Sequence, residues 1–508
     1  MTEQPNILIL MADQLRASAL PAYGNTVAKT PNLNRLADRS VIFENAYCNF
    51  PLCAPSRSVF MSGQLATHIG AFDNAAEFSS QTPTFAHYLR TFGYETILSG
   101  KMHFCGPDQL HGFEKRLTTD IYPADYNWTP DWTRFDERLE WYHTMHSVTE
   151  AGKCVRTNQL DFDEEVVFNA RQKLFDMARE PGQRPFAMVV SLTHPHDPFT
   201  IPDPWWSLYT DEEIDDPVVP EPPGTDPHAK RLRHVNGAEL LQPTPAQVKT
   251  ARRAYYGACS FVDHQFGILL DTLEATGFAE NTIVIVMADH GEMLGERGMW
   301  YKMSFHEDAC RIPLLISAPG RFAPHRVSEC VSLVDLLPTL ASVASPDWKE
   351  QAPTRFLDGH SLLPHCMGEG GTDGVYGEYT AEGAVAPMVM IRRGQYKFIH
   401  CPADPDQLYD LKQDPYELNN LAALPEHAAL TEQFRAEVAR EWDIPALHEA
   451  VLASQERRSF VARALAKGQQ SPWDHQPDRD ASSMYIRSHM DLEVLEKRAR
   501  FPTVAHHE

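Results

Sequence analysis

Residues 6–13, Asn-Ile-Leu-Ile-Leu-Met-Ala-Asp, form a continuous apolar run that ends in a carboxylate. A run without polar alternation is typical of a strand covered on both faces of a parallel sheet. A second run, Thr-Ile-Val-Ile-Val-Met-Ala-Asp at 282–289, repeats the pattern and leads into His290. The carboxyl ends of parallel strands meet at one edge of an open α/β sheet, where ligands bind. We therefore expect Asp13 and Asp289 to converge at that edge.

Apolar runs and helical periods alternate along most of the chain, which predicts an α/β fold with helices on both faces of a mixed, mostly parallel sheet. A long amphipathic stretch from Pro245 to Thr276 predicts a helix that Gly277 ends. After about residue 375, short extended segments and then a helical stretch predict a smaller α+β domain. The other expected strands lie at 94–98, 186–191, 313–317, 388–392 and 396–400, and the other expected helices at 84–92 and 431–442.

The predicted domain organisation has three parts: a catalytic domain at 1–375, a small C-terminal α+β domain at 376–455, and an extended tail at 456–508. A chain of 508 residues is longer than one hydrophobic core usually supports, so more than one domain is expected. The last fifty residues are polar and lack a core of their own. We expect this tail either to fray or to pack on another surface, such as that of a second subunit in a homo-oligomer.

Composition excludes some classes of partner. The formal net charge of -24 argues against nucleic acid, whose phosphates are bound by basic patches, and would attract a cationic substrate. No apolar window approaches a membrane span, and the start of the chain has no signal-peptide pattern, so we expect no membrane association. The nine cysteines are odd in number and show no paired spacing, which indicates reduced thiols in the cytoplasm.

Residues 51–64, Pro-Leu-Cys-Ala-Pro-Ser-Arg-Ser-Val-Phe-Met-Ser-Gly-Gln, contain the most specific chemical signal in the chain. The pattern Cys-x-Pro-x-Arg at Cys53, Pro55 and Arg57 resembles the signature of the sulfatase family, in which the cysteine is oxidised to formylglycine. A single cysteine is more often a buried structural thiol, but the fixed spacing around Cys53 favours a nucleophile. Pro55 in a first helical turn would place Cys53 at a helix N-terminus, which favours anionic groups.

The resemblance implies an alkaline-phosphatase-like fold and a metal-dependent reaction. One hydroxyl of the hydrated aldehyde would attack sulfur in line, and the other would help to expel sulfate from the covalent intermediate. A formylglycine-generating or equivalent maturation enzyme would be required. The late segments 408–417 and 420–422 also match the family, in a part whose role we expect to be structural.

A divalent metal site is implied at the strand ends. Carboxylate oxygens suit Ca²⁺, with Mg²⁺ as the alternative. Many sulfatases have two adjacent aspartates after the first strand, whereas this chain has Asp13-Gln14, which leaves open whether the Gln14 amide oxygen is a ligand. Helix N-capping is the commoner role of a lone aspartate in such a loop. The metal-site residues implied by the resemblance are Asp13, Gln14, Cys53, Asp289 and His290.

Two lysines are expected to neutralise the sulfate oxygens as charge builds in the transition state. Lys101 lies in the Gly100-Lys-Met-His103 motif, and Lys302 follows the second metal loop as in the family. An alkyl sulfate ester needs a proton donor, for which His196 is favoured over His103, and His194 is a competitor two residues before His196. The predicted catalytic set is Cys53, Arg57, Lys101, His103, His196 and Lys302.

Several further segments resemble choline-sulfatases in particular. The substrate implied is choline O-sulfate, whose quaternary ammonium is recognised by aromatic faces and carboxylates. In these segments Trp128 is expected to stack on the trimethylammonium group and Glu382 to oppose its charge, with Asn74 and His143 as further substrate contacts. The resembling segments are 69–78, 100–104, 106–111, 118–125 and 472–477, and the tail residues Asp491 and Glu493 are candidates for added negative charge.

Three alternatives remain at this level. An arylsulfatase, or a phosphate or phosphonate ester hydrolase, would use the same scaffold, because sulfate and phosphate esters share a tetrahedral geometry. A non-catalytic binder of quaternary ammonium compounds is the alternative outside the enzymes. The complete set of cysteine, lysine and metal-site motifs favours a sulfatase.

Overall fold

The computed structural model describes residues 4–469 apart from 123–124, 181, 183 and 222–225, and beyond them residues 473–477, 482, 488 and 490–502. In this part of the chain the largest feature is one nine-stranded sheet. Its strands are β1 (Asn6–Asp13), β2 (Val41–Tyr47), β3 (Glu95–Gly100), β4 (Lys115–Arg116), β6 (Phe186–Pro195), β8 (Thr282–Ala288), β9 (Arg311–Ile312), β10 (Leu314–Ser317) and β11 (His325–Ser332).

The strand order is β11-β2-β10-β8-β1-β6-β3-β4, and β9 pairs with β2. β1 lies between β6 and β8 and is parallel to both. β10 is antiparallel to both β8 and β2, and β9 is antiparallel to β2. The predicted mixed, mostly parallel sheet is confirmed. Ala12 pairs with Ala288, so the residues that follow them, Asp13 and Asp289, leave adjacent strands at the same edge.

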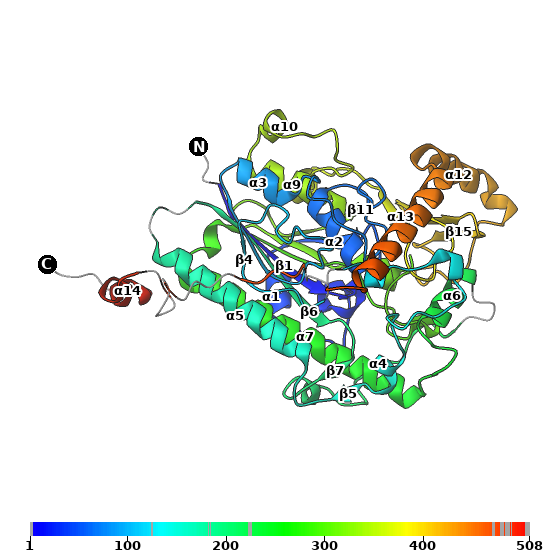
Figure 1. Cartoon of the computed structure of the whole chain (residues 1–508), viewed down its shortest axis with the longest axis horizontal. Coiled ribbons are helices and arrows are strands. Elements are labelled where there is room, and N and C mark those ends of the chain that lie inside the picture. The colour runs from blue at the N-terminus through cyan, green and yellow to red at the C-terminus, as the bar shows by residue number, and fades with distance from the viewer. Residues whose placement is uncertain are drawn as a thin grey trace.

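Helices cover both faces of the sheet (Figure 1). α1 (Pro31–Ala37), α5 (Asn158–Arg179) and α7 (Pro245–Thr276) lie on one face, and α2 (Cys53–Ser62), α3 (Phe85–Thr91) and α9 (Leu336–Ala344) on the other. α7 has the predicted bounds because the Thr244 hydroxyl caps its start and Gly277 ends it with a φ of 78°. The connections contain α4 (His146–Thr149), α6 (Pro227–Val235), α8 (Glu307–Cys310), α10 (Trp348–Gln351), α11 (Leu363–Cys366) and the paired strands β5 (Gly152–Lys153) and β7 (Thr200–Ile201).

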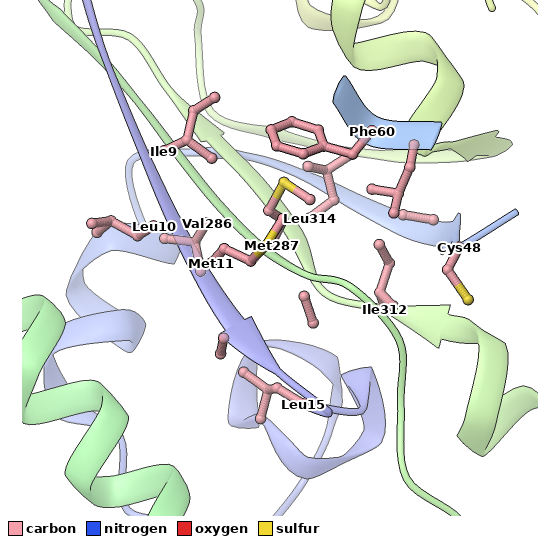
Figure 2. Packing of buried hydrophobic residues seen from close by; sticks show 14 of the residues in the cluster. Ile9, Leu10, Met11, Leu15, Cys48, Phe60, Val286, Met287, Ile312 and Leu314 are labelled. Carbon is pink, nitrogen blue, oxygen red and sulfur yellow. The ribbon is translucent and has the colours of Figure 1, made fainter. Parts of the chain in front are cut away.

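The core lies between the sheet and these helices. Every residue of β8 is buried, as are the last seven residues of β1, which explains why neither sequence shows polar alternation. Figure 2 shows side chains from several elements, among them Ile9 of β1, Met287 of β8 and Phe60 of α2, packed in one cluster. This packing holds the ends of β1 and β8 and the start of α2 in a fixed relation.

A second, antiparallel sheet follows in the chain, as predicted for the α+β part. Its strands are β12 (Val375–Tyr379), β13 (Met388–Arg393), β14 (Tyr396–Cys401) and β15 (Asp404–Asp410). α12 (Ala428–Glu441) packs on it, and the rings of Phe398 and Phe434 stack at 5.4 Å between centroids. α13 (Ile444–Leu465) then runs back toward the large sheet and its helices (Figure 1). The predicted division at residues 455–456 falls inside α13, and the proposed domain limits remain predictions.

The described part of the tail contacts its own chain. The ring of Trp473 lies 5.1 Å from that of Tyr126, and His475 Nε2 lies 3.3 Å from the carbonyl oxygen of Arg116. The exposed residues Asp491 and Glu493 lie at the start of α14 (Leu492–Ala499). Pro472, and residues 123–124 of the predicted segment 118–125, lie outside the described residues. In the part of the chain that is described, no helix is both long enough and apolar enough to cross a membrane.

Candidate active site

The ends of β1 and β8 and the start of α2 meet at one buried point. The Cys53 sulfur lies 3.2 Å from His290 Nε2 and 3.9 Å from Asp13 Oδ1. One donor atom from each of Asp13, Cys53, Asp289 and His290 lies within 4.8 Å of all the others, and all four residues are buried. The structure thus brings together four of the five predicted metal-site residues, as expected from the two Met-Ala-Asp strand ends.

Arg57 and Lys101 balance the charge of this cluster. Arg57 donates from Nε to Asp289 Oδ2 at 2.9 Å and from its guanidinium NH₂ group to Asp13 Oδ2 at 3.0 Å, and Lys101 Nζ also contacts Asp13 Oδ2. All four side chains are fully buried. Burial by itself would raise the pKa of the Asp13 carboxyl, but Lys101 and Arg57 hold it well below its usual value. Asp13 is therefore ionised at neutral pH, and its Oδ1 faces Cys53 and His290.

Gln14 lies beside the cluster with its amide held in one orientation. Its Nε2 donates to the Glu292 carboxylate, and its Oε1 accepts from Lys302 Nζ at 2.6 Å. The other Glu292 oxygen accepts from the backbone N–H groups of Leu294 and Tyr301, each at 2.7 Å. Sequence reasoning missed Glu292, although its place three residues after Asp289 was a signal that it lies at the same sheet edge.

Lys302 connects Gln14 to the histidines. Its Nζ lies 2.8 Å from His196 Nε2, which must accept, so the His196 ring carries its hydrogen on Nδ1 and donates to the Asp197 carbonyl oxygen at 2.6 Å. Burial and the charge of Lys302 hold the pKa of His196 well below its usual value, and the same two causes lower the pKa of His143. Both imidazoles are therefore neutral in the free protein at neutral pH.

His194 lies away from this region. Its Nδ1 is 2.7 Å from Asp163 Oδ2 on α5, and its ring packs edge-on against Phe261 of α7 at 4.9 Å. Because Asp163 also accepts from the backbone N–H of His194, the residue is fixed between the sheet and the helices. Of the two histidines in the 194–196 segment, only His196 faces the cluster.

A cavity of about 140 Å³ opens beside Cys53. All four predicted substrate residues line it, together with four of the predicted catalytic residues. Sequence reasoning missed two of its aromatic residues, Tyr122 and Trp141, because each belongs to an irregular loop without a distinctive spacing. The lining residues are Cys53, Asn74, His103, Tyr122, Trp128, Trp141, His143, His196, Lys302 and Glu382.

Aromatic rings form one wall of the cavity. The indoles of Trp128 and Trp141 lie 6.4 Å apart at an interplanar angle of 12°, and the His103 ring meets Trp128 edge-on at 5.5 Å. Both ring nitrogens of His103 are buried and have no hydrogen-bond partner in the described structure. His103 can therefore donate to or accept from a molecule in the cavity.

Glu382 lies on the cavity wall without a partner. The residue is only 2% exposed, and neither carboxylate oxygen has a hydrogen-bond partner among the described residues. Burial raises the pKa of this carboxyl to about 7. A buried carboxylate without a partner is costly, so the position suits a cationic ligand.

The donor set at the strand ends fits a hard divalent cation. It offers carboxylate oxygens from Asp13 and Asp289. The neighbouring Gln14 carries a further oxygen, which accepts from Lys302 Nζ. The Cys53 thiol is the soft exception, and its oxidation to formylglycine would replace sulfur by oxygen at the same position. Arg57 and Lys101 contact the Oδ2 oxygen of Asp13, whereas Cys53 lies nearest to its Oδ1.

Comparison with known proteins identifies the family. The model of the sulfatase family matches residues 5–346, which include every residue of the strand-end cluster. The chain belongs to the sulfatase family. Models of the choline sulfatase enzyme C terminal and of the N-sulphoglucosamine sulphohydrolase C-terminal part match residues 449–501 and 295–443 of this sulfatase. The family implies a metal ion and a formylglycine, and the buried Asp, Cys and His cluster is in keeping with both.

Individual relatives agree with the family. The choline-sulfatase of Rhizobium meliloti is 47% identical over 99% of both chains, so the predicted resemblance to choline-sulfatases is confirmed. An arylsulfatase of Clostridium perfringens is 25% identical over 86% of this sulfatase and 94% of its own length. Among solved structures, the phosphonate monoester hydrolase of Silicibacter pomeroyi has a TM-score of 0.68 at 24% identity, over 87% of this chain and 96% of its own, which shows a shared fold.

Proposed function

We propose that this sulfatase hydrolyses choline O-sulfate to choline and sulfate. The observation that carries the proposal is the unpartnered, buried carboxylate of Glu382, which shares one cavity with Cys53 and with the Trp128 and Trp141 rings. One end of the cavity thus suits a quaternary ammonium and the other a sulfate ester. The choline-sulfatase of Rhizobium meliloti supports this reading through its identity along the whole chain.

The sulfate group would lie against Cys53, which we propose is converted to formylglycine by a maturation enzyme. Asp13, Gln14, Asp289 and His290, with the oxidised Cys53, would hold a divalent metal, for which we propose Ca²⁺. When bound, the metal would supply Lewis acidity that favours an ionised nucleophile and neutralises a sulfate oxygen. The start of α2 adds backbone N–H groups that favour the anionic substrate at residue 53.

Lys101 and Lys302 would stabilise the charge on the sulfate oxygens in the transition state. Both are fully buried; the Lys101 ammonium contacts Asp13, and that of Lys302 donates to the Gln14 amide oxygen. Because both side chains are buried in a medium of lower dielectric constant, each charge acts more strongly than it would in bulk solvent. Arg57 is a positioning residue that orients Asp13 and Asp289.

His196 is the proposed proton donor to the choline oxygen, with His103 as the second candidate. Its Nε2 faces Lys302 and the cavity, and Asp197 fixes the ring through Nδ1. The pKa of His196 is low in the free protein because of burial and Lys302. An anionic sulfate beside the ring would act in the opposite direction and favour the protonated form.

Choline would be held by shape, dispersion and charge rather than by hydrogen bonds. Trp128 and Trp141 offer π faces to the methyl groups, and Glu382 supplies the countercharge. Asn74 accepts from the Ala54 N–H at 2.9 Å, so its amide is fixed beside the nucleophile. His143 completes the lining on the side of His196, with ring centroids 5.9 Å apart.

The proposal includes a cytoplasmic, homo-oligomeric enzyme. All nine cysteines lie in the described part of the chain, where all are unpaired and eight are buried, in keeping with a reducing compartment. The exposed apolar residues Phe460 and Val461 near the end of α13 suit contact with a second subunit. Asp491 or Glu493 of such a subunit would add negative charge near the cation end of the cavity.

One comparison of substrates tests the proposed function. Hydrolysis rates for choline sulfate, an aryl sulfate and a phosphonate monoester should be measured on protein whose residue 53 has been identified by peptide mass spectrometry. We expect choline sulfate to have the highest kcat/KM. A dominant aryl sulfate or phosphonate activity would contradict the proposal, and choline binding without metal-dependent sulfate release would favour a non-catalytic binder. An unmodified cysteine in fully active protein would rule out formylglycine.

A further inference from the structure

One face of α13 presents polar side chains to the catalytic domain. Its buried residues are Val451, Ser454, Gln455 and Arg458, at the spacing of a single helix face. Three of the four are polar, which is unusual for a helix that packs on a core. Each of the two larger ones, Gln455 and Arg458, contacts a loop that carries a cavity residue.

Arg458 joins two of these loops. Its guanidinium makes a bidentate contact with the Asp73 carboxylate, with both N–O distances 2.6 Å, and donates to the Thr129 hydroxyl at 3.2 Å. Its Nε donates to Ser454 on the same helix at 3.2 Å. Arg458 is 7% and Asp73 1% exposed, so the fork is fixed in a dry environment where a charged pair strongly prefers one geometry.

The partners of Arg458 are sequence neighbours of cavity residues. Asp73 precedes Asn74, whose side chain lines the cavity and accepts from the Ala54 N–H beside the nucleophile. Thr129 follows Trp128, the aromatic wall. One guanidinium group therefore sets the spacing between the Asn74 side and the Trp128 side of the cavity.

Gln455 supports the loop that carries Glu382 indirectly, through Trp132. Its Oε1 accepts from the backbone N–H of Trp132 at 3.0 Å, and the Trp132 indole N–H donates to the Ala381 carbonyl oxygen at 3.1 Å. Ala381 directly precedes Glu382. The Trp132 ring also packs against His448 of α13, with centroids 5.5 Å apart. The position of Glu382 thus depends on α13 through Trp132.

The two ends of the cavity have different supports. Cys53, Lys101 and Lys302 are held by the cluster at the ends of β1 and β8. Trp128 and Glu382, at the other end, are carried on loops that are tied to α13. Asn74, beside the nucleophile, is tied to α13 through its neighbour Asp73. The family model for the choline sulfatase enzyme C terminal begins at residue 449, just before this face of the helix.

We propose that Arg458 and Gln455 are specificity-determining positioning residues, which hold the cation end of the cavity in the shape that accepts the organic part of the substrate. This inference rests on the proposed function, because it assumes a cationic leaving group. Neither residue touches substrate; Arg458 acts through Asp73 and Thr129, and Gln455 acts through Trp132. A shift of about 1 Å in the loops they hold would cost about tenfold to a hundredfold in the reaction of a substrate that depends on those loops.

Arg458→Gln and Gln455→Leu test the inference, with Arg457→Gln as the matched control because Arg457 is exposed on the same turn of α13. Kinetics with choline sulfate and with a neutral aryl sulfate should be measured on the mature, metal-loaded enzyme. We expect both test variants to raise KM for choline sulfate about tenfold or more with little change in kcat, and to change aryl sulfate kinetics about twofold at most. Arg457→Gln should match the wild type with both substrates.

The outcomes separate this inference from the proposed function. A wild-type enzyme that does not prefer choline sulfate defeats the proposed function. If the wild type prefers choline sulfate but both test variants lose the two substrates in equal proportion, α13 has only a structural role and the inference is wrong. Should Arg458→Gln fail to fold, Gln455→Leu, which leaves the Arg458–Asp73 pair intact, carries the test alone.

Discussion

The side-chain amide of Gln14 donates to the carboxylate of Glu292, and this contact decides which way the amide points. Since the other Glu292 oxygen is held by two backbone N–H groups, the carboxylate cannot rotate to follow Gln14. The amide oxygen is thereby directed to Lys302 Nζ, from which it accepts at 2.6 Å. Where many sulfatases have a second aspartate, this chain has a neutral amide whose oxygen is oriented by a carboxylate behind it.

Glu292→Gln is therefore expected to weaken metal binding. A neutral amide at 292 can donate as well as accept, so the orientation of Gln14 would depend on Lys302 alone and would be held less tightly. Loss of such an outer partner typically costs about 10–100-fold in metal affinity. Calorimetric titration of metal into metal-free protein would measure the change, with the exposed Glu280→Gln as control. Equal metal affinities in the two variants would show that the contact of Gln14 with Glu292 does not affect metal binding.

Cys53→Ala is expected to abolish sulfate release and leave the fold intact. The side chain is small, and the first turn of α2 depends on the backbone and on the Asn74 contact with Ala54 rather than on sulfur. Sulfate release and the thermal unfolding midpoint should be measured on the same preparation. Normal turnover would show that residue 53 is not the nucleophile.

Asp13→Ala is expected to reduce both metal affinity and stability. Arg57 and Lys101 would keep their charges in a fully buried site after losing a shared partner. Breaking a buried ion pair from one side costs about 3–5 kcal/mol of unfolding free energy. Chemical denaturation of metal-free protein measures this loss directly. Asp289→Ala leaves Arg57 paired with Asp13, so it should cost less stability while still weakening metal binding.

Ionisation of Glu382 should appear in the pH dependence of choline sulfate hydrolysis. Its pKa is raised to about 7 by burial, so the countercharge for choline develops as the pH rises through 7. The kcat/KM profile for choline sulfate should rise over this interval more steeply than that for a neutral aryl sulfate. Glu382→Gln should remove the difference between the two profiles. If the two pH profiles still differ in Glu382→Gln, the difference is due to the ionisation of another group.

Ionisation of Glu382, which should raise activity toward choline sulfate, should lower the stability of the folded protein. The pKa of Glu382 is higher in the folded protein than its usual value of 4.5, so the folded state binds the proton more tightly and loses stability as the pH rises from about 4.5 past 7. A shift of this size corresponds to roughly 3 kcal/mol at pH 8. Glu382→Gln should therefore unfold at a higher temperature than the wild type at pH 8 and at a similar temperature at pH 4.

Trp128→Ala is expected to reduce kcat/KM for choline sulfate by somewhat more than tenfold, since a desolvated cation–π contact contributes about 2 kcal/mol. The effect on a neutral aryl sulfate should be smaller. A matched change of the exposed Phe135 to Ala should affect neither substrate. Equal losses with both substrates in Trp128→Ala would argue that the indole only shapes the loop.

Local sequence patterns were sufficient to predict the elements that carry the catalytic motifs. The apolar runs before Asp13 and Asp289 predicted buried parallel strands, because burial on both faces removes polar alternation. The motif around Cys53 predicted the start of α2. The direction of β10 was not predictable, because an apolar run of four residues carries no sign of whether its partner is parallel or antiparallel.

Residues that act through tertiary contacts could not be predicted from the sequence. Tyr122 and Trp141 lie in irregular loops, and nothing in their spacing indicates that they share a cavity. Arg458 is 385 residues from Asp73, so the bidentate contact between them leaves no trace in either local sequence. His194 and His196 have nearly the same sequence context, and tertiary contacts separate them, with Asp163 for His194 and with Lys302 for His196.

The adjacency of β1 and β8 makes the catalytic centre sensitive to strand length rather than to strand composition. Ala12 and Ala288 are paired, and each is followed by its aspartate. Many apolar residues could replace one another upstream, since only burial is required there. Insertion of a single residue would advance one carboxylate by about 3.3 Å and turn it to the opposite face of the sheet. Homologues and engineered variants should therefore vary freely in the identity of these strand residues, but hardly at all in their number.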